Sequence, residues 1–340
     1  MTPRIRPLDE AAMDAARARQ AQLVKPPGSL GRLEELAVWL AGVTGQPRPQ
    51  VNARVVVAAA DHGVAAEHVS AFPPEVTGQM LATFLSGGGA VSVLAHETEA
   101  ELICVDAGVN ADTSALDVVR TGLAPSANLA IERALSRDDV VAAIEVGRAL
   151  AKAAARDGIT ILIGGEMGIG NTTPATALAC HLTGRDPREL TGPGTGLDAE
   201  GVARKAEVIQ RALKRHTPAD PVDALAHFGG GEIAVLVGLA LGAGEYGLGY
   251  VCDGLIATSA AAIAAAIAPD LKPRLVAGHR SPEPAHPRLL GILGIRPILD
   301  LDMRLGEASG AVAALAILKL AAAAHDEMLT FAEAGVSTGE

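Results

Sequence analysis

Short apolar segments of strand length alternate along the chain with longer segments of helical periodicity. Strands that are apolar on both faces are typical of a parallel sheet covered by helices on both sides. Five such segments end in a turn that carries glycine or aspartate: RVVVAAADHGV from Arg54, ELICVDAGV from Glu101, ITILIGGEMG from Ile159, YVCDGL from Tyr250 and RLVAGH from Arg274. Helices are expected between them, over residues 138–156, 174–182, 198–215, 232–242 and 255–267. The pattern predicts an α/β fold with a mostly parallel sheet, in which ligands bind where the strands end.

The two ends of the chain lack strand patterns. Residues 1 to about 45 contain two helical segments, the second with Ser29 as its expected N-cap, and one long alanine-rich helix is expected from Glu307 onward. We predict that residues 1–45 and 305–340 form a small helical domain. Residues 46–304 would then form a large α/β domain that carries the active site.

The composition limits the classes of partner and compartment. The net charge of −11 argues against nucleic acid, because phosphate contacts need clusters of Lys and Arg. The three cysteines, Cys104, Cys180 and Cys252, are far apart and are expected to be buried thiols in a reducing compartment. The N-terminus has no signal-peptide core, and the apolar stretch 254–268 is too short to span a membrane. We expect a soluble, cytoplasmic protein.

The stretch GGEMGIGNTTP, from Gly164, raises a chemical question. Glycines after a strand let backbone N–H groups approach an anion, and the helix that follows offers its positive end. Yet Glu166 stands in the same turn, where a phosphate would meet it. The residues match neither the dinucleotide nor the nucleoside-triphosphate motif. They also fit a plain strand–turn–helix with Asn171 or Thr172 as N-cap.

A second glycine-rich loop, TGPGTG from Thr191, leads into a helix with Asp198 as its expected N-cap. Lys205 lies about two turns inside that helix. A lysine beside a loop of free N–H groups suits a monophosphate, although a lysine on a helix is more often simply solvated. Two such loops in one chain favour a phosphorylated small molecule as the ligand.

Other polar residues near the strand ends are less specific. His62 follows a strand, and His279 and Arg280 lie in GHRSPEPAH, where they could line a cleft or a subunit contact. Glu232 and Glu307 are each expected at the start of a helix, where a carboxylate is a routine partner of the helix dipole. The nine histidines form no H-x-x-x-H or similar motif, so no metal site is predicted.

Taken together, the motifs resemble a known family. In chain order from Lys25 to Ala311 they are KPPGSLGRLEELA, ADHGV, SAFPPEVTGQM, GGGAV, DAGV, GEMGIGNTTPATAL, TGPGTG, FGGGEIA, DG, GHRSPEPAH and DLDMRLGEASGA. This series resembles the nicotinate-nucleotide–dimethylbenzimidazole phosphoribosyltransferases of cobalamin lower-ligand synthesis, and the resemblance covers essentially the whole chain. It implies a Rossmann-like large domain, a small helical domain and a homodimer, without a metal or organic cofactor.

The resemblance also implies a reaction and a site. Phosphoribose would pass from nicotinate mononucleotide to 5,6-dimethylbenzimidazole, with inversion of the anomeric centre. Glu307 matches the family's proposed general base, and Glu166 matches a second carboxylate that would contact the ribose or balance charge in the transition state. The resemblance assigns the phosphate to Gly168, Ile169, Gly192, Gly194, Gly196 and Lys205. It assigns the wall of the base pocket to Ser70 and Gln79.

Two alternatives remain open from the sequence. One is a non-catalytic nucleotide-binding protein that keeps the loops without the chemistry. The other is a related phosphoribosyltransferase for another acceptor, such as adenine, a substituted benzimidazole or a phenol. An intact Glu307 favours catalysis over binding alone, because a pure binder has no need of a base.

Overall fold

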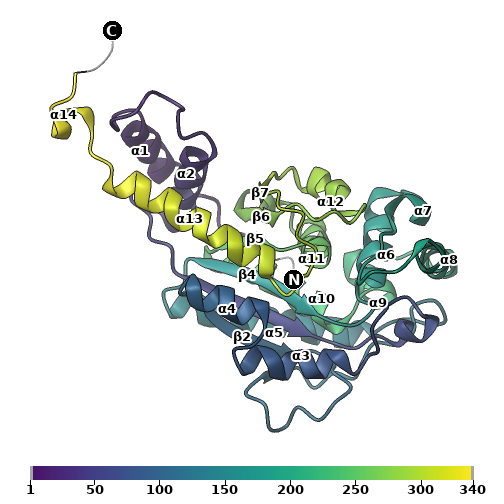
Figure 1. The fold of residues 1–340 in the computed structure, drawn as a ribbon. Helices are drawn as coiled ribbons and strands as arrows, with labels where there is room; N and C mark the ends of the chain where they lie inside the picture. Colours follow the sequence, from purple (N-terminus) through teal and green to yellow (C-terminus); the bar gives the residue numbers. More distant parts are fainter. Residues whose placement is uncertain (1–2, 338–340) are drawn as a thin grey trace.

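The computed structural model describes residues 3–337, which are built around one seven-stranded sheet. The extreme ends of the predicted terminal segments, residues 1–2 and 338–340, lie outside the described residues. The strands are β1 (Ala53–Ala59), β2 (Glu101–Asp106), β3 (Val119–Arg120), β4 (Ile161–Met167), β5 (Gly249–Cys252), β6 (Leu275–His279) and β7 (Pro297–Leu299). All neighbouring strands pair in parallel, in the order β3-β2-β1-β4-β5-β6-β7 (Figure 1). The predicted α/β fold with a parallel sheet is confirmed.

The strand order reverses at the centre of the sheet. From β1 the chain builds outward to β2 and β3, then returns to β4 on the other side of β1 and continues outward to β7. In this Rossmann-like arrangement the crevice between the two central strands is the usual ligand site. Asp61 and His62 follow β1, and Glu166 is the second-last residue of β4.

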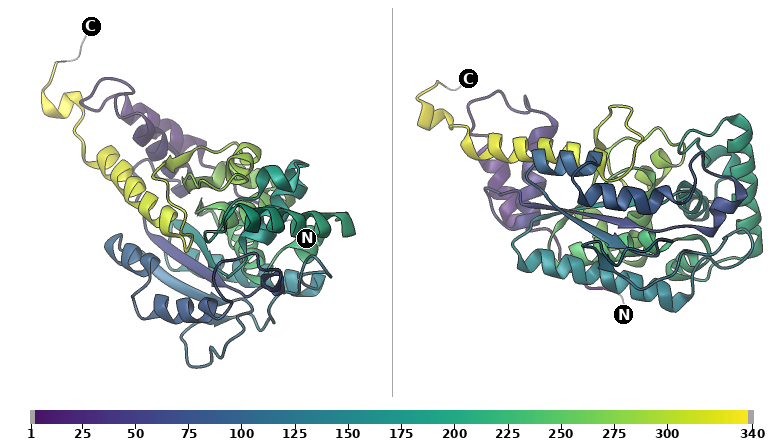
Figure 2. Two further views of the ribbon diagram at one scale, coloured as in Figure 1. Left: turned by 45° about the vertical axis from the view of Figure 1, so that its right-hand side comes forward. Right: turned by 60° about the horizontal axis from the view of Figure 1, so that its bottom comes forward.

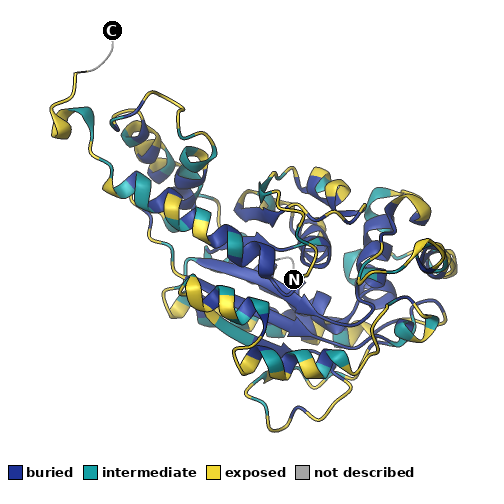
Figure 3. Cartoon of the chain, viewed as in Figure 1, coloured by how far each residue is buried: buried dark blue, intermediate teal, exposed yellow. Residues whose placement is uncertain are grey.

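Helices cover both faces of the sheet. They are α1 (Glu10–Gln20), α2 (Arg32–Thr44), α3 (Val76–Leu85), α4 (Ala90–Glu97), α5 (Arg137–Arg156), α6 (Thr172–Thr183), α7 (Pro187–Leu190), α8 (Ala199–Arg215), α9 (Pro221–Phe228), α10 (Gly231–Tyr246), α11 (Leu255–Ile267), α12 (His286–Leu293), α13 (Ser309–Glu327) and α14 (Phe331–Ala334), with short 3₁₀ turns at Gly63–Glu67 and Pro269–Arg274. Alternate residues of β1 face two separate cores, Val56 and Ala58 one of them and Val55 and Val57 the other. Strands β1, β4, β5 and β6 are accordingly buried along their whole length (Figure 3).

Glycines replace aromatic bulk where helices pack. A Cβ atom at Gly147 of α5 would lie 2.1 Å from the carbonyl oxygen of Val235, and one at Gly238 of α10 would lie 2.0 Å from that of Ile144. The two helices can therefore touch along their backbones. This close packing lets a chain with 2% aromatic residues fill its core.

The terminal helices lie together at one end of the molecule. Helix α2 packs on α1 and on α13, which crosses one face of the sheet (Figure 2). Leu36 and Leu40 of α2 share a core with Val55 and Ile161 of the sheet. Helices α2 and α13 thus pack directly on the α/β part, and the separation of the terminal helices into a domain of their own stays a prediction.

Several local predictions were wrong or incomplete. Helix α2 has Gly31 as its N-cap, so Ser29 does not have that role. Strands β3 and β7 were missed because each has only two or three residues. The long C-terminal helix begins at Ser309, because Glu307 and Ala308 have positive φ angles of 61° and 65°. All three cysteines are buried and free, as predicted.

Two segments, Val76–Glu97 and Ser309–Glu327, are long and apolar enough to cross a membrane by length and composition alone. The first is divided into α3 and α4. The second is α13, which packs on α2, α4 and β6. Both segments therefore have packing partners in the fold.

Candidate active site

The predicted catalytic residues meet at the carboxyl ends of the central strands. Glu166 comes from β4, and Glu307 comes from the loop just before α13, 141 positions later in the chain. A Cβ atom at Gly306 would lie 2.6 Å from Oε1 of Glu166, so the Glu166 carboxylate lies against the backbone directly before Glu307. The fold therefore brings the Glu166 carboxylate against the loop that carries Glu307.

Glu307 is held in an unusual backbone conformation. Its φ of 61° and the φ of 65° at Ala308 lie in the left-handed region, which costs about 1–2 kcal/mol for each residue other than glycine. The side chain is buried, and its Oε2 has no hydrogen-bond partner within residues 3–337. Glu307 thus presents a buried carboxylate oxygen that is free to accept a proton or a hydrogen bond.

Both carboxylates are easier to protonate than an ordinary glutamate. Burial, followed by the charge of Asp253, raises the pKa of Glu307 to about 7. Burial also raises the pKa of Glu166 to about 8, and the charges of Asp253, Glu232 and Glu307 add to this effect. A hydrogen bond from Asn171 to Glu166 opposes the rise. A group with a pKa near neutrality suits proton transfer at physiological pH.

Lys205 lies on α8 and is fully buried, and its side chain reaches the second glycine-rich loop, residues 191–196, called the lysine loop below. Its Nζ donates hydrogen bonds to Oγ1 of Thr172 at 2.6 Å and to the carbonyl oxygen of Gly192 at 3.3 Å. A Cβ atom at Gly194 would lie 3.2 Å from the same Nζ. Burial lowers the pKa of Lys205 to about 8, and nearby Glu283 partly offsets this. The alternative considered from the sequence, that Lys205 is a solvated residue on the surface of its helix, is therefore wrong.

An unexpected acid also occupies this loop. Glu283, from the segment GHRSPEPAH, accepts a hydrogen bond from the backbone N–H of Gly194 at 2.9 Å. Its other oxygen, Oε2, is buried and has no hydrogen-bond partner in the described chain. A Cβ atom at Gly192 would lie 2.2 Å from that oxygen. The carboxylate thus takes one of the N–H groups that an anion would use.

The start of α6 connects the carboxylates with the lysine loop. Asn171 donates to Glu166, and the next residue, Thr172, accepts from Lys205. Asn171 is the N-cap residue of α6, although its side chain makes no capping hydrogen bond because it is turned toward Glu166. Two consecutive residues therefore touch the two halves of the candidate site.

The three remaining residues that were predicted to hold the phosphate, Gly168, Ile169 and Gly196, have different surroundings. Gly168 packs close to His62, since a Cβ atom there would lie 3.2 Å from its Nε2. The N–H of Ile169 already donates to Oγ1 of Thr77 at 3.1 Å, so a phosphate would have to replace that bond. Gly196, with a φ of 111°, has no neighbour within 4 Å of a would-be Cβ and closes the turn before α8. Of these three, Gly196 keeps the most open position.

Ser70 and Gln79 are not equivalent. Ser70 pairs with Oγ1 of Thr195 at 3.0 Å, which joins its loop to the lysine loop. It also borders a cavity of about 620 Å³ that is lined further by Asp61 and Phe72. Gln79 lies in α3 and is exposed. The structure therefore links Ser70 to the second glycine-rich loop, and it places Gln79 at an exposed position of α3.

His62 belongs to a buried polar pair that the sequence did not reveal. Its Nε2 lies 2.9 Å from Oε1 of Glu232, and its Nδ1 lies 3.1 Å from Oγ of Ser126. Both His62 and Glu232 are completely buried. Since Gly168 lies against the imidazole ring of His62, the pair of His62 and Glu232 packs against the first glycine-rich loop. The signal available in the sequence was the position of His62 directly after a strand.

His279 and Arg280 point to different environments. His279 is buried at the end of β6, with its Nε2 3.6 Å from Oδ1 of Asp253. Arg280 is exposed and pairs with Asp300 at 3.4 Å. It therefore lies on the surface of the molecule.

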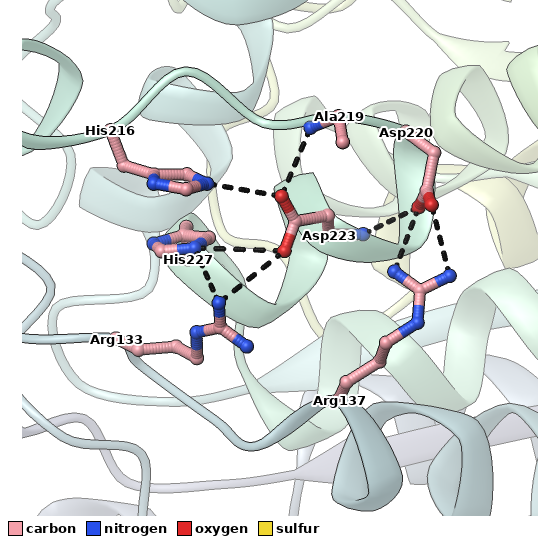
Figure 4. A network of polar contacts seen from close by, with 7 residues as sticks. All are labelled: Arg133, Arg137, His216, Ala219, Asp220, Asp223 and His227. Atoms are coloured by element: carbon pink, nitrogen blue, oxygen red, sulfur yellow. Dashed lines mark hydrogen bonds and ion pairs between the residues drawn. The ribbon is translucent and has the colours of Figure 1, made fainter.

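One group among residues 3–337 has the composition of a metal site. His216, Asp223 and His227 place their ligand atoms within 4.8 Å of one another (Figure 4). The two imidazole rings are stacked with centroids 3.4 Å apart, and Arg133 lies 2.9 Å from Nε2 of His227. A guanidinium at this position competes with a cation, and stacked rings do not point their lone pairs at a common ion. Asp223 and His227 are four residues apart on α9, so the group contains no pair of histidines at helical spacing.

Known proteins of one family are similar to this chain over nearly its whole length. The family model DBI_PRT, described as a phosphoribosyltransferase, matches residues 5–336. A protein of Chloroflexus aggregans named nicotinate-nucleotide–dimethylbenzimidazole phosphoribosyltransferase is 50% identical over 338 residues, covering 98% of this chain and 96% of that protein. A protein of the same name from Desulforudis audaxviator is 47% identical, with the same coverage. The crystal structure of CobT from Thermus thermophilus superimposes with a TM-score of 0.91 at 43% identity, covering 97% of this chain and 100% of that one.

Proposed function

The chain belongs to the DBI_PRT phosphoribosyltransferase family, and from that premise we propose the reaction that it catalyses. Phosphoribose passes from nicotinate mononucleotide to 5,6-dimethylbenzimidazole, with inversion at the anomeric carbon. The products are α-ribazole 5′-phosphate and nicotinate. The chain is therefore an enzyme of the pentosyltransferase class.

One observation about the site carries the assignment of residues. Asn171 and Thr172, adjacent at the start of α6, contact Glu166 and Lys205 respectively. This contact places a carboxylate pair and a cationic, glycine-lined loop next to each other. A ribose phosphate has a matching polarity, because its anomeric carbon becomes cationic during transfer while its phosphate is anionic. Glu166 is therefore no obstacle to phosphate binding, since it serves the opposite end of the ligand.

Glu307 acts as the general base. The bond between the anomeric carbon and the pyridine nitrogen breaks, and its electron pair returns to nicotinate, which leaves as a neutral ring nitrogen and needs no acid. A benzimidazole nitrogen forms the new bond to carbon with its lone pair. The proton on the other benzimidazole nitrogen passes to the Glu307 carboxylate. The unpartnered Oε2 of Glu307 supports this role, because in the described chain nothing else competes for it.

Glu166 stabilises the ribose side of the transition state. One of its oxygens accepts from Asn171, which fixes the orientation of the carboxylate. Burial raises the pKa of Glu166 in the empty site to about 8, and a bound cationic nucleotide would lower it again and favour the ionised carboxylate. The phosphate rests on Lys205 and the loop Gly192, Gly194 and Gly196, with Gly168 and Ile169 on the other side. Ser70 and Gln79 line the pocket of the base.

The enzyme assignment is tested by incubating the protein with nicotinate mononucleotide and a panel of bases, followed by mass identification of the products. We expect nicotinate and the α-linked nucleotide of dimethylbenzimidazole. Preferred transfer to adenine or to a phenol would instead assign a related phosphoribosyltransferase. Tight binding of nicotinate mononucleotide without turnover on any base would reverse the enzyme assignment in favour of a binding protein.

We further propose that the protein works as a cytoplasmic homodimer without a cofactor and without nucleic-acid or membrane partners. Leu301 and Leu305, in the segment that leads to Glu307, are more than half exposed, and so is Leu320 on α13. Exposed leucines beside a site favour coverage by a second protein surface. Light scattering after gel filtration should give twice the mass of one chain, and a monomer that retains full activity would contradict the dimer.

A further inference from the structure

The segment that carries Glu307 is seated on three neighbouring strands. A Cβ atom at Gly165 of β4 would lie 2.6 Å from the backbone nitrogen of Ala308. A Cβ atom at Gly278 of β6 would lie 2.5 Å from Cα of Ala311. The two glycines therefore form a seat for the first turn of α13. Between them, β5 ends at Cys252 and is followed at once by Asp253.

Asp253 is the polar part of this seat. Its side chain is buried, and its Oδ1 accepts a hydrogen bond from the N–H of Ala311 at 2.8 Å. Ala311 is the third residue of α13, a position whose N–H is normally satisfied by an N-cap side chain. The N-cap residue of α13 is Ala308, which has no side-chain oxygen to offer. Asp253 thus caps α13 from a separate strand.

His279 packs on the same turn from β6. Its Nε2 lies 3.6 Å from Oδ1 of Asp253, and a Cβ atom at Gly310 would lie 2.1 Å from Cδ2 of the ring. Gly310 and Gly278 therefore allow the histidine and the strand to reach the helix backbone. Residues of β4 and β6, and Asp253 directly after β5, therefore all contact the first turn of α13. The contact of Asp253 is a hydrogen bond to its side chain.

The strained residues directly precede this turn. Glu307 and Ala308 keep positive φ angles, which persist in proteins only when the surroundings hold them. The N–H of Ser309 donates to the carbonyl oxygen of Gly306, so the first turn of α13 is tied directly to the loop of Glu307. We propose that Asp253 is a positioning residue for Glu307: its carboxylate fixes the start of α13 and thereby holds the base over the strand ends. The inference rests on the proposed function, because it takes Glu307 as the base.

The test compares Asp253→Ala with Asp253→Asn in steady-state transfer from nicotinate mononucleotide to dimethylbenzimidazole. Alanine removes the acceptor, and kcat should fall about 10- to 100-fold, the usual effect of a base displaced by about 1 Å, while both KM values change less than threefold. Asparagine keeps a carbonyl oxygen for Ala311 and should restore most of kcat. Asp9→Ala is the matched control, since Asp9 caps α1 at Ala12 and its loss should leave kcat unchanged.

A double-mutant cycle separates positioning from a structural role. If Asp253 acts through Glu307, Asp253→Ala should lower the residual kcat of Glu307→Gln less than threefold. The same full 10- to 100-fold loss in that background would overturn the proposal, and so would an asparagine variant as slow as the alanine variant. If alanine prevents folding, Asp253→Glu replaces it, because its longer side chain displaces the turn; unchanged kcat in that variant would also overturn the proposal. Turnover by the unaltered protein reports on the proposed function separately.

Discussion

The two halves of the candidate site contrast in the charge that they bury. On one side Glu166 and Glu307 lie together, and burial raises the pKa of both to about 8 and about 7. On the other side Lys205 is buried among glycines, and its pKa is lowered to about 8. Each half therefore holds a group whose pKa is shifted toward its neutral form, although the two groups are of opposite kind.

The contrast shows how one small site can serve a ligand with two opposite ends. A buried charge without a counter-charge is costly, so each group shifts its pKa toward the neutral form. A phosphate beside Lys205 and a cationic ribose beside the glutamates would each provide the missing counter-charge. The empty site thus contains buried charged groups without counter-charges, and a ligand with one positive and one negative end supplies both.

The largest effect is expected at the base. Glu307→Gln preserves the volume but removes the proton acceptor, and kcat should fall about 10²- to 10⁴-fold. Product formation by mass spectrometry and circular dichroism of the variant measure activity and folding together. Glu245→Gln, which alters a glutamate bound to Arg148 on α5, is the matched control and should keep full activity. Unchanged turnover of Glu307→Gln would remove the proposed base.

Replacement of Lys205 should alter substrate binding, whereas replacement of Glu307 should alter turnover. Lys205→Met keeps the buried chain length but removes the charge, so KM for nicotinate mononucleotide should rise roughly 10- to 100-fold, the usual value of a charged hydrogen bond. The affinity for dimethylbenzimidazole should change little. Lys272→Met removes another lysine hydrogen-bonded to a backbone carbonyl, that of Ile292, and should leave KM unchanged. A loss confined to kcat would place the lysine at the reacting centre instead.

The glutamate half should also affect stability with pH. The folded pKa of Glu307, about 7, is above its ordinary value of 4.5, so the folded state binds a proton more tightly. The stabilisation is therefore complete below about pH 4.5 and is lost as the pH rises through 7. The glutamine of Glu307→Gln cannot ionise. In urea unfolding at pH 8, the free energy of unfolding of this variant should exceed that of the original protein by about 1–3 kcal/mol, after allowance for solvent screening. At pH 5 the difference should nearly vanish; an equal difference at both pH values would contradict the shift.

The smallest effect concerns the acid in the lysine loop. Glu283→Gln keeps an acceptor for Gly194 but removes a negative charge beside the proposed phosphate position. At pH 6.5, where Lys205 stays protonated, KM for nicotinate mononucleotide should fall about threefold and kcat should stay the same. Isothermal titration with the nucleotide provides the check. Weaker binding would mean that the carboxylate shapes the loop more than it repels the ligand.

Much of the fold could be predicted because periodicity is a local property. Helix α11 covers the predicted residues 255–267, and Asp198 caps α8 through Gly201, as the sequence indicated. Strands β3 and β7 escaped because two or three residues carry no period. The helix before which Glu307 lies was placed two residues too early, since alanine and glutamate give no sign of a left-handed backbone.

The sequence indicated candidate site residues but not the contacts that they make. Glu166 belongs to a recognisable glycine-rich segment, and Lys205 lies on the helix that follows the second such loop, so both could be proposed from the sequence. The contacts of Asp253 with Ala311 and of Glu283 with Gly194 join segments 58 and 89 residues apart. Such contacts depend on how the sheet closes, and no local pattern encodes them.

The order of the elements along the chain has a consequence for synthesis. Strands β1, β4, β5 and β6, with the lysine loop, are complete once His279 has been added, whereas Glu307 becomes fixed only when α13 docks. A nascent chain that has folded its sheet would therefore hold the phosphate loop and Glu166 but still lack the base. If Glu307 is the base, as proposed, a chain that ends before α13 should bind the nucleotide but be unable to transfer its phosphoribose.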